Sequence, residues 1–151
     1  MLIQSSSSLN ASEFIFPALE CIHIIGFAIA IGTIAILDFR LLGLGLMRQS
    51  VADLARDLAP WTLAGLASML LSGPVMFSSD PDMYYLNISF QVKMVLLLLA
   101  IVFHYTIHRK VTFKGAYPGR GKLIACVSLA LWMGVIAGGL FIAFVGDAIP
   151  E

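Results

Sequence analysis

Charged residues are scarce in this chain. Asp, Glu, Lys and Arg together make up 12% of its 151 residues, whereas hydrophobic residues make up 60%. Soluble domains have about 25% charged and about 45–50% apolar residues. The nine basic and nine acidic residues give a formal net charge of zero, so nothing in the charge balance indicates a nucleic-acid partner. The composition predicts an integral membrane protein whose first partner is the lipid bilayer.

Cysteine is rarer still, since the chain holds only Cys21 and Cys126. The two lie at opposite ends of their predicted spans, so we expect no disulfide. The sequence has no nucleotide-binding loop, catalytic triad or zinc motif. The first 13 residues carry no Lys or Arg, and the apolar run after them is too long for a signal-peptide core. We therefore expect that run to remain in the mature protein.

Four apolar stretches are long enough to cross a bilayer, which takes about 20 residues in a helix. We predict helices at about residues 14–40, 60–77, 88–108 and 123–145. Pro60 suits the first position of a helix, and the segment 50–58 before it resembles a short amphipathic turn capped by Ser50 and Asp53. Residues 1–151 are thus predicted to form one all-α membrane domain, a bundle of four transmembrane helices.

The basic residues predict the orientation of this bundle. Lys and Arg follow the first and third helices, and none lies in the N-terminal tail, between the second and third helices, or after the fourth helix. Cytoplasmic loops carry the excess of basic residues. We therefore expect loops 41–59 and 109–122 in the cytoplasm and both termini outside, in the inner (cytoplasmic) membrane of a bacterium.

The first helix carries two ionisable residues, Glu20 and His23, within its apolar run. An ionisable side chain inside a membrane span indicates a functional site by default. The two are three residues apart and share one helix face, which Gly26, Ala30 and Thr33 continue with small side chains. That face has room for a neighbouring helix or for a flat cofactor. Glu20, close to the helix start, is interpreted as an interfacial or ion-paired acid rather than a catalytic one.

Lys93 is the one basic residue within a predicted span, and antiparallel helices put it and Met94 at the depth of Glu20 and His23. His23 is either an axial ligand of a b-type haem or a histidine hydrogen-bonded to a neighbouring helix. Lys93 either neutralises a haem propionate or another anionic group, or it pairs with Glu20 or snorkels to the interface. Met94 is a candidate sixth ligand of the iron.

One face of the third helix carries the other two histidines. Eleven residues make close to three helical turns, so this face includes Lys93, Leu97, Ala100, His104 and His108. His104 is the better site candidate, and His108 is interpreted as interfacial because Arg109 follows it. Asp38 and Arg40 close the first apolar run and are interpreted as its cytoplasmic anchor.

Two groups of residues carry a resemblance to known families. His23-Ile24-Ile25-Gly26, followed by Gly32 and Arg40-Leu41, resembles the first helix of the small bacterial membrane protoporphyrinogen oxidase and of the copper-resistance protein D group. Lys93-Met94, a leucine run and His104 resemble the Lys-Leu…His pattern of that oxidase family. The segment 38–43 is similar to the Asp-x-Arg-Leu-Leu-Gly sequence of an uncharacterised bacterial four-helix family.

The resemblance implies a four-helix bundle with b-type haem carried by His23, Lys93 and His104, with Arg40 in support. The chain departs from the oxidase pattern at Asp38-Phe39, where that family tends to have Leu-Pro. This departure speaks against the oxidase activity more than against the haem.

Two classes of function follow from these observations. The first is a b-haem membrane protein that moves electrons, as an oxidoreductase or a cytochrome-like subunit with a membrane or periplasmic redox partner. The second is a non-catalytic accessory subunit of a larger complex or oligomer, or a copper-handling protein, although the methionines are too dispersed to indicate copper uptake strongly. The sequence leaves substrate and electron partner open.

The depths of His23 and His104 in the membrane indicate whether the two histidines bind one haem or belong to two separate sites. His23 lies near the outer end of the first helix and His104 lies deep in the third, an offset of roughly 15 Å at 1.5 Å per residue. Trans axial ligands approach an iron at similar depth. We therefore predict one outer haem with His23 as ligand, Lys93 near its propionates, and Met94 or nothing opposite. His104 then serves a separate inner site or a structural hydrogen bond.

Overall fold

The computed structural model describes residues 14–45, 48–114 and 119–146, and these residues form helices and turns without any β-strand. The helices are α1 (Ile15–Leu42), α2 (Val51–Phe77), α3 (Pro81–Tyr85), α4 (Ile88–Phe103), the π-helical turn η1 (His104–His108), α5 (Arg109–Lys114) and α6 (Arg120–Gly146). α4, η1 and α5 are continuous, and with α1, α2 and α6 they make four rods long and apolar enough to cross a membrane. The predicted all-α bundle of four transmembrane helices is confirmed, and the chain is a multi-pass membrane protein.

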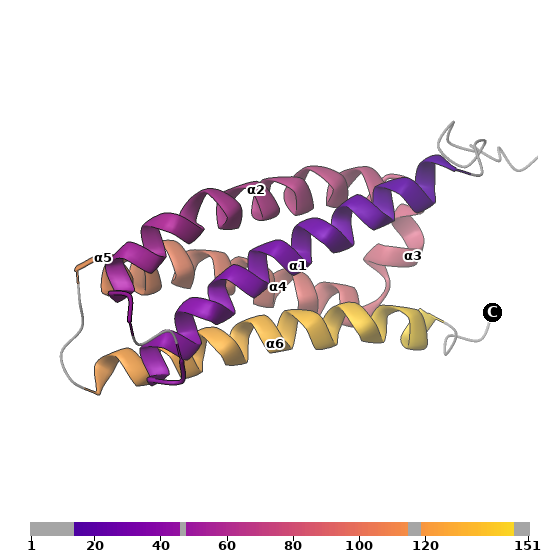
Figure 1. Ribbon diagram of the computed structural model, residues 1–151. Coiled ribbons are helices and arrows are strands. Elements are labelled where there is room, and N and C mark those ends of the chain that lie inside the picture. Colours follow the sequence, from indigo (N-terminus) through magenta and orange to yellow (C-terminus); the bar gives the residue numbers. More distant parts are fainter. Residues whose placement is uncertain (1–13, 46–47, 115–118, 147–151) are drawn as a thin grey trace, which may run out of the picture.

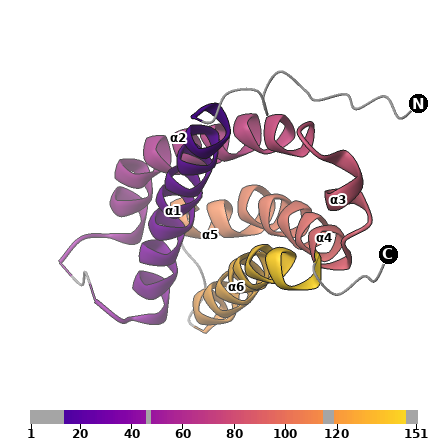
Figure 2. The same cartoon turned by 90° about the vertical axis from the view of Figure 1, so that its right-hand side faces the viewer.

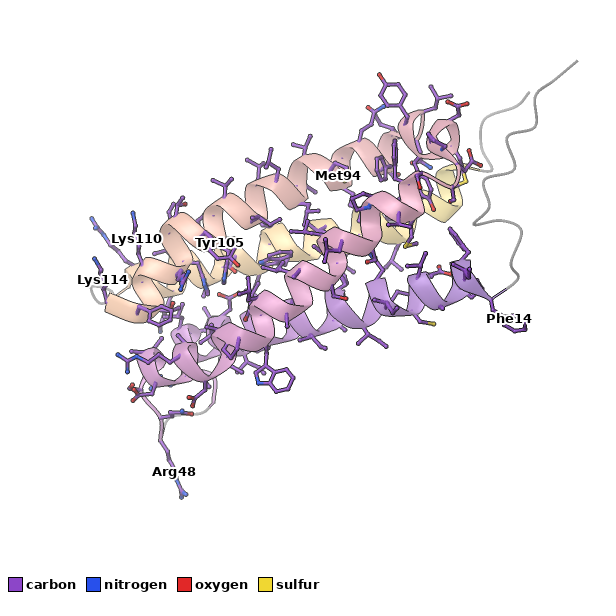
Figure 3. All side chains as sticks on the ribbon, turned by 90° about the horizontal axis from the view of Figure 1, so that it is seen from above. Phe14, Arg48, Met94, Tyr105, Lys110 and Lys114 are labelled. Carbon is purple, nitrogen blue, oxygen red and sulfur yellow. The ribbon has the colours of Figure 1, made fainter. Side chains whose placement is uncertain are left out.

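The rods pack as two antiparallel pairs (Figure 1). α1 packs along α2, α4 packs along α6, and α1 also contacts α6; Figure 2 shows the two pairs side by side. The start of α1 and the end of α6 lie at one end of the bundle. Figure 3 places Arg48, Lys110 and Lys114 at the opposite end from Phe14. We call these the Phe14 end and the basic end. The positive-inside rule predicts orientation from such a gathering of basic residues at one end of a bundle.

α2 begins well before Pro60. Its N-cap is Ser50, whose hydroxyl accepts a hydrogen bond of 3.1 Å from the backbone N–H of Asp53, so the predicted cap is confirmed. Pro60 lies inside the helix, where a proline costs about 3 kcal/mol. The first turns of α2 bury Leu54 against Leu37 of α1, and this packing favours the continuous helix. The predicted helix start at Pro60 was therefore wrong.

The third rod also extends beyond its predicted end. It remains helical through Lys114, and α6 begins at Arg120, so much of the predicted loop 109–122 is helix; residues 115–118 of that loop lie outside the described residues. Thr112 is buried, and Phe113 packs against the cluster that contains Leu37 and Leu54. These contacts stabilise the extra turns and cover the basic end of the bundle.

A second helix occupies the small-residue face of α1. Gly65 of α2 packs so closely there that a Cβ atom added to it would lie 2.6 Å from the carbonyl oxygen of Gly26 and 2.7 Å from the backbone nitrogen of Ala30. Farther along the same face, the hydroxyls of Thr33 and Thr62 are hydrogen-bonded at 2.8 Å. Of the two alternatives left open by the sequence, the part of this face from Gly26 to Thr33 holds the neighbouring helix and not a flat cofactor.

Apolar side chains fill the middle of the bundle. They come from α1, α2, α4 and α6 and comprise Ala30, Ile34, Leu66, Met69, Leu97, Ala100, Trp132 and Val135. Burying a large apolar side chain of this kind stabilises a fold by about 1.5–3 kcal/mol in water, whereas in lipid the gain comes from close packing. This cluster separates the polar residues of the Phe14 end from those of the basic end.

Candidate functional site

At the Phe14 end, a hydrogen-bond network fixes the ring of His23. Its Nδ1 lies 2.9 Å from the hydroxyl of Ser72 on α2. That hydroxyl donates its single proton to the carbonyl oxygen of Ser68 at 2.7 Å, so it accepts a hydrogen bond from Nδ1–H of His23. A neutral imidazole carries one N–H and one lone pair. The network therefore assigns the lone pair of His23 to Nε2.

The second nitrogen of His23 makes no side-chain hydrogen bond with a described residue, and the backbone of Met69 also interacts with the ring. The ring is half-buried and lies over Gly73, since a Cβ atom at Gly73 would come within 3.4 Å of its Cε1. A neutral imidazole with one nitrogen held and a lone pair on the other is the form in which histidine binds a metal ion.

Lys93 lies across from His23 on α4. It packs against α6, where Cβ atoms added to Gly138 and Gly139 would lie 3.0 Å from its Cβ and 3.6 Å from its Nζ. Its ammonium is close enough to act electrostatically on His23. The alternative that Lys93 forms an ion pair with Glu20 is not realised, because no such contact joins these two described side chains. Lys93 thus places an ammonium group at the Phe14 end, without a carboxylate partner among the described residues.

Glu20 instead lies exposed near the short helix α3. Burial raises the pKa of Tyr84 on α3 above its usual value, and the carboxylates of Glu20 and Asp80 raise it further. The ring of Tyr84 packs near the rings of Phe77 and Phe90, at centroid distances of 6.2 Å and 5.5 Å. Glu20 therefore lies exposed at the Phe14 end, and its interpretation as an interfacial acid stays a prediction.

Met94 and Arg40 are not gathered around His23. Met94 lies on the exposed surface of α4 (Figure 3), where 45% of its area is accessible. Arg40 lies at the basic end, and its Nε and Nη2 donate hydrogen bonds of 3.2 Å and 3.0 Å to the carbonyl oxygen of Gln49. These two bonds tie the end of α1 to the segment that leads into α2, which gives Arg40 a structural role.

At the basic end, Asp38 and His108 form a buried pair. His108 Nε2 lies 2.7 Å from Asp38 Oδ1, and both side chains are fully buried. The sequence analysis interpreted Asp38 as a cytoplasmic anchor and His108 as interfacial, and the structure adds that both side chains are buried within the bundle. Asp38 falls one turn after buried Ile34, and His108 one turn after buried His104. This spacing was the signal that could have placed both of them inside.

A π-helical turn brings His104 and His108 together. The backbone N–H of Arg109 donates to the carbonyl oxygen of His104, five residues back. The two imidazole rings stack with centroids 5.1 Å apart and planes inclined by 26°. Leu97, Ala100 and these two histidines, which the spacing predicted to share one face, are all buried in the structure. Single π turns occur frequently at functional sites.

Three polar atoms of this cluster are buried without a hydrogen-bond partner in the described part of the chain: Asp38 Oδ2, His104 Nδ1 and His108 Nδ1. An unpaired buried polar atom costs about 1–3 kcal/mol, so such a cluster indicates a bound partner or a chemical role. Among the described residues, however, no group of three or more His, Cys, Asp or Glu side chains has a geometry that holds a metal ion.

A cavity of about 190 Å³ adjoins this cluster. It lies between the first half of α2 and the segment formed by η1 and α5. Its walls are Leu37, Ala55, Ala59, Pro60, Thr62, Leu63, His104, Tyr105, Arg109, Thr112 and Phe113. The guanidinium of Arg109 lies over the rings of Tyr105 and Phe113, at 5.9 Å and 5.5 Å from their centroids. Apolar atoms predominate in the walls, and His104 is their most deeply buried titratable side chain.

The structure thus groups the predicted candidates in two places. His23 and Lys93 come together at the Phe14 end, and His104 joins His108 and Asp38 at the basic end, with the apolar core between them. Sequence reasoning missed Ser72, which orients His23. The signal for it is weak, since serines in membrane helices commonly bond their own backbone, as Ser72 also does.

Comparison with models of protein families gives a match over most of the chain. The family model described as "Family of unknown function (DUF6644)" matches residues 15–145. No curated protein and no solved structure matches the chain. The match covers both groups of polar residues and agrees with the predicted similarity to an uncharacterised membrane family. The resemblance to the oxidase and copper-resistance groups stays a prediction.

Proposed function

The chain belongs to the DUF6644 family, and we propose that it is an integral membrane protein that holds a b-type haem and moves electrons through it. His23 would hold the haem iron through Nε2. The observation that carries this proposal is the network in which Ser72 fixes Nδ1–H of His23 and leaves Nε2 with its lone pair and without a side-chain partner among the described residues. Ligand histidines are typically oriented in this way by a hydrogen bond to their other nitrogen.

Lys93 supports the proposal as the partner of an anionic group. A lysine costs about 2.5–3.5 kcal/mol at the centre of a span and less toward its ends on insertion scales, and among the described residues Lys93 has no carboxylate partner. Haem propionates are carboxylates that accept hydrogen bonds from such an ammonium. Lys93 would therefore hold a propionate close to the iron ligand and recover the cost of its own burial.

The side chains at the Phe14 end carry the chemical groups that a haem requires: the imidazole of His23 can bind the iron, and the ammonium of Lys93 can bind a propionate. The group, when bound, supplies a one-electron change of oxidation state at its iron. Ser72 then sets the orientation of the His23 ring, and Lys93 balances the negative charge of the propionates. Below them the apolar core, which includes Met69 and Leu97, excludes water from the rest of the bundle.

The proposed location follows from the charge distribution. The basic end faces the cytoplasm of a bacterium, so the haem lies toward the periplasmic side of the inner membrane. A membrane or periplasmic protein is the proposed redox partner, and the chain acts as an oxidoreductase or as a cytochrome-like subunit. The competing function is a non-catalytic accessory subunit or a copper-handling protein, and no described contact favours it.

The absorption spectrum of the purified protein tests this function. We expect protein extracted in mild detergent from haem-supplied cells to show a Soret band, and a pyridine haemochrome assay to give a stoichiometric amount of haem b. Circular dichroism on the same sample controls for folding. A helical, monodisperse protein without a Soret band, even after haem is added, would contradict the proposal and favour the accessory subunit.

A further inference from the structure

The cavity at the basic end has no role in the proposed haem site, from which the apolar core separates it. Its volume of about 190 Å³ equals on the order of six water molecules at about 30 Å³ each. Leu37, Leu63 and Phe113 give it apolar walls, and water is held in a cavity only by several polar partners. The volume and walls suit one ring-sized organic molecule better than a cluster of water.

The polar side chains that line the cavity indicate which hydrogen-bonding group a bound ring needs. The hydroxyl of Thr112 donates to the carbonyl oxygen of Arg109 at 3.0 Å, and that of Thr62 is bonded to Thr33 and to the carbonyl oxygen of Leu58. His104 differs from them, since it is 7% exposed and neither of its ring nitrogens has a hydrogen-bond partner among the described residues. Its Nδ1 is fully buried, so Nε2 is the nitrogen that a ligand in the cavity would meet. The occupant therefore needs an oxygen or N–H group for an imidazole nitrogen.

The side chains of His108 and Asp38, which form a buried set with His104, restrict the class of ligand further. The ring of His108 stacks on it, and Asp38 holds His108 from the other side. Histidines backed by a carboxylate form the kind of buried set that accepts and returns protons within a membrane. A ligand whose ring oxygens gain and lose protons uses such a set, whereas a hydrocarbon chain or a sterol does not.

We propose that this cavity binds the ring of a lipid-soluble quinone or hydroquinone, with one ring oxygen hydrogen-bonded to the imidazole of His104. The apolar walls enclose the ring, and Asp38 and His108 hold His104 in place. Two exposed wall residues, Leu63 and Tyr105, open the cavity toward the surface of the bundle. A ligand dissolved in the bilayer can therefore enter from the side.

A pair of alanine substitutions on α2 tests the proposal. Ala59 lines the cavity, whereas Ala64 is exposed on another face of the same helix. Ala59→Leu fills the cavity, and Ala64→Leu adds the same side chain outside it. The probe is a short-chain ubiquinone added to purified protein in detergent, and bound probe is measured after equilibrium dialysis. Comparing the two variants removes the contribution of partition into micelles.

We expect saturable binding by the wild-type protein and by Ala64→Leu, and binding weaker by about tenfold, or 1.4 kcal/mol, in Ala59→Leu. His104→Leu should lose a similar amount. Equal binding by Ala59→Leu and Ala64→Leu, or no saturable binding by the wild type, would overturn the proposal. Displacement of the probe by inorganic phosphate would also overturn it, since it would assign the cavity to an anion at Arg109. His23→Ala should bind the probe like the wild type. The quinone site can therefore be disproved without disproving the haem, and the haem without disproving the quinone site.

Discussion

Asp38 on α1 and His108 on η1 are joined by a hydrogen bond of 2.7 Å within the basic end of the bundle, and both side chains are fully buried. The pair links the first rod to the third. Removing one partner of a buried pair leaves the other polar group uncompensated, which costs far more than loss of an exposed pair. The geometry of this pair leads to a prediction about stability.

We expect Asp38→Leu or His108→Leu alone to lower the free energy of unfolding by about 3–5 kcal/mol. The double variant should lose less than the sum of the two single variants, because it leaves no orphaned charge. Unfolding by SDS in mixed micelles measures these differences. The exposed pair Asp53–Arg56, with its N–O distance of 2.9 Å, is the matched control and should contribute less than about 1 kcal/mol. Equal costs at the two pairs would contradict the prediction.

Gly65 should tolerate no side chain. A methyl group there would lie within 2.7 Å of the backbone of α1, so Gly65→Ala must push α1 and α2 apart and should cost about 1–3 kcal/mol. At Gly32 nothing lies within 4 Å of an added Cβ atom. Gly32→Ala should therefore be neutral or stabilise the helix by up to about 1 kcal/mol. The same unfolding assay compares them, and an equal effect at both positions would rule out close packing at Gly65.

The contrast between these sites shows what the sequence could predict. Long apolar runs set the four rods, and helical periodicity placed Leu97, Ala100, His104 and His108 on one face, although it did not show that this face is buried. Ser50 was recognised as a cap because capping depends on neighbouring residues alone. These features are local, so they can be inferred without knowledge of the packing.

Features that depend on packing escaped the sequence analysis. Asp38 is buried because the first turns of α2 and all of α5 cover the basic end, and the sequence analysis had assigned both segments outside the membrane helices. Ser72 reaches His23 only because the small residues of α1 let α2 approach closely. No residue type in the segment 104–108 indicates a π turn, and its backbone bond to Arg109 is visible only in the structure.

Lys93→Met should separate insertion from ligand binding. Methionine removes the cost of a charge in the span, so the variant should insert at least as well as the wild type. Because the proposed propionate loses its cation, we expect a clear fall in the haem retained through purification. Lys110→Met, at the opposite end of the bundle (Figure 3), is the control and should retain all of it. Full haem content in Lys93→Met would show that Lys93 only snorkels.

The predicted topology puts the basic end in the cytoplasm and both termini outside. A reporter active only in the cytoplasm should be active when fused after Arg48 and inactive when fused after Asp82. A periplasmic reporter at the same two positions gives the reciprocal control. Activity of one reporter at both positions would contradict the orientation and would move the proposed haem to the other side of the membrane.

The ligand of the iron is the centre of the proposed function, and haem spectra of His23→Ala and His104→Ala test it most directly. Both proteins should be purified side by side and compared at equal helix content. Because Ser72 presents His23 for ligation and the apolar core separates it from His104, we predict that His23→Ala lacks the Soret band and that His104→Ala keeps it. Loss of haem from both variants to the same extent, or from His104→Ala alone, would contradict the assignment of His23.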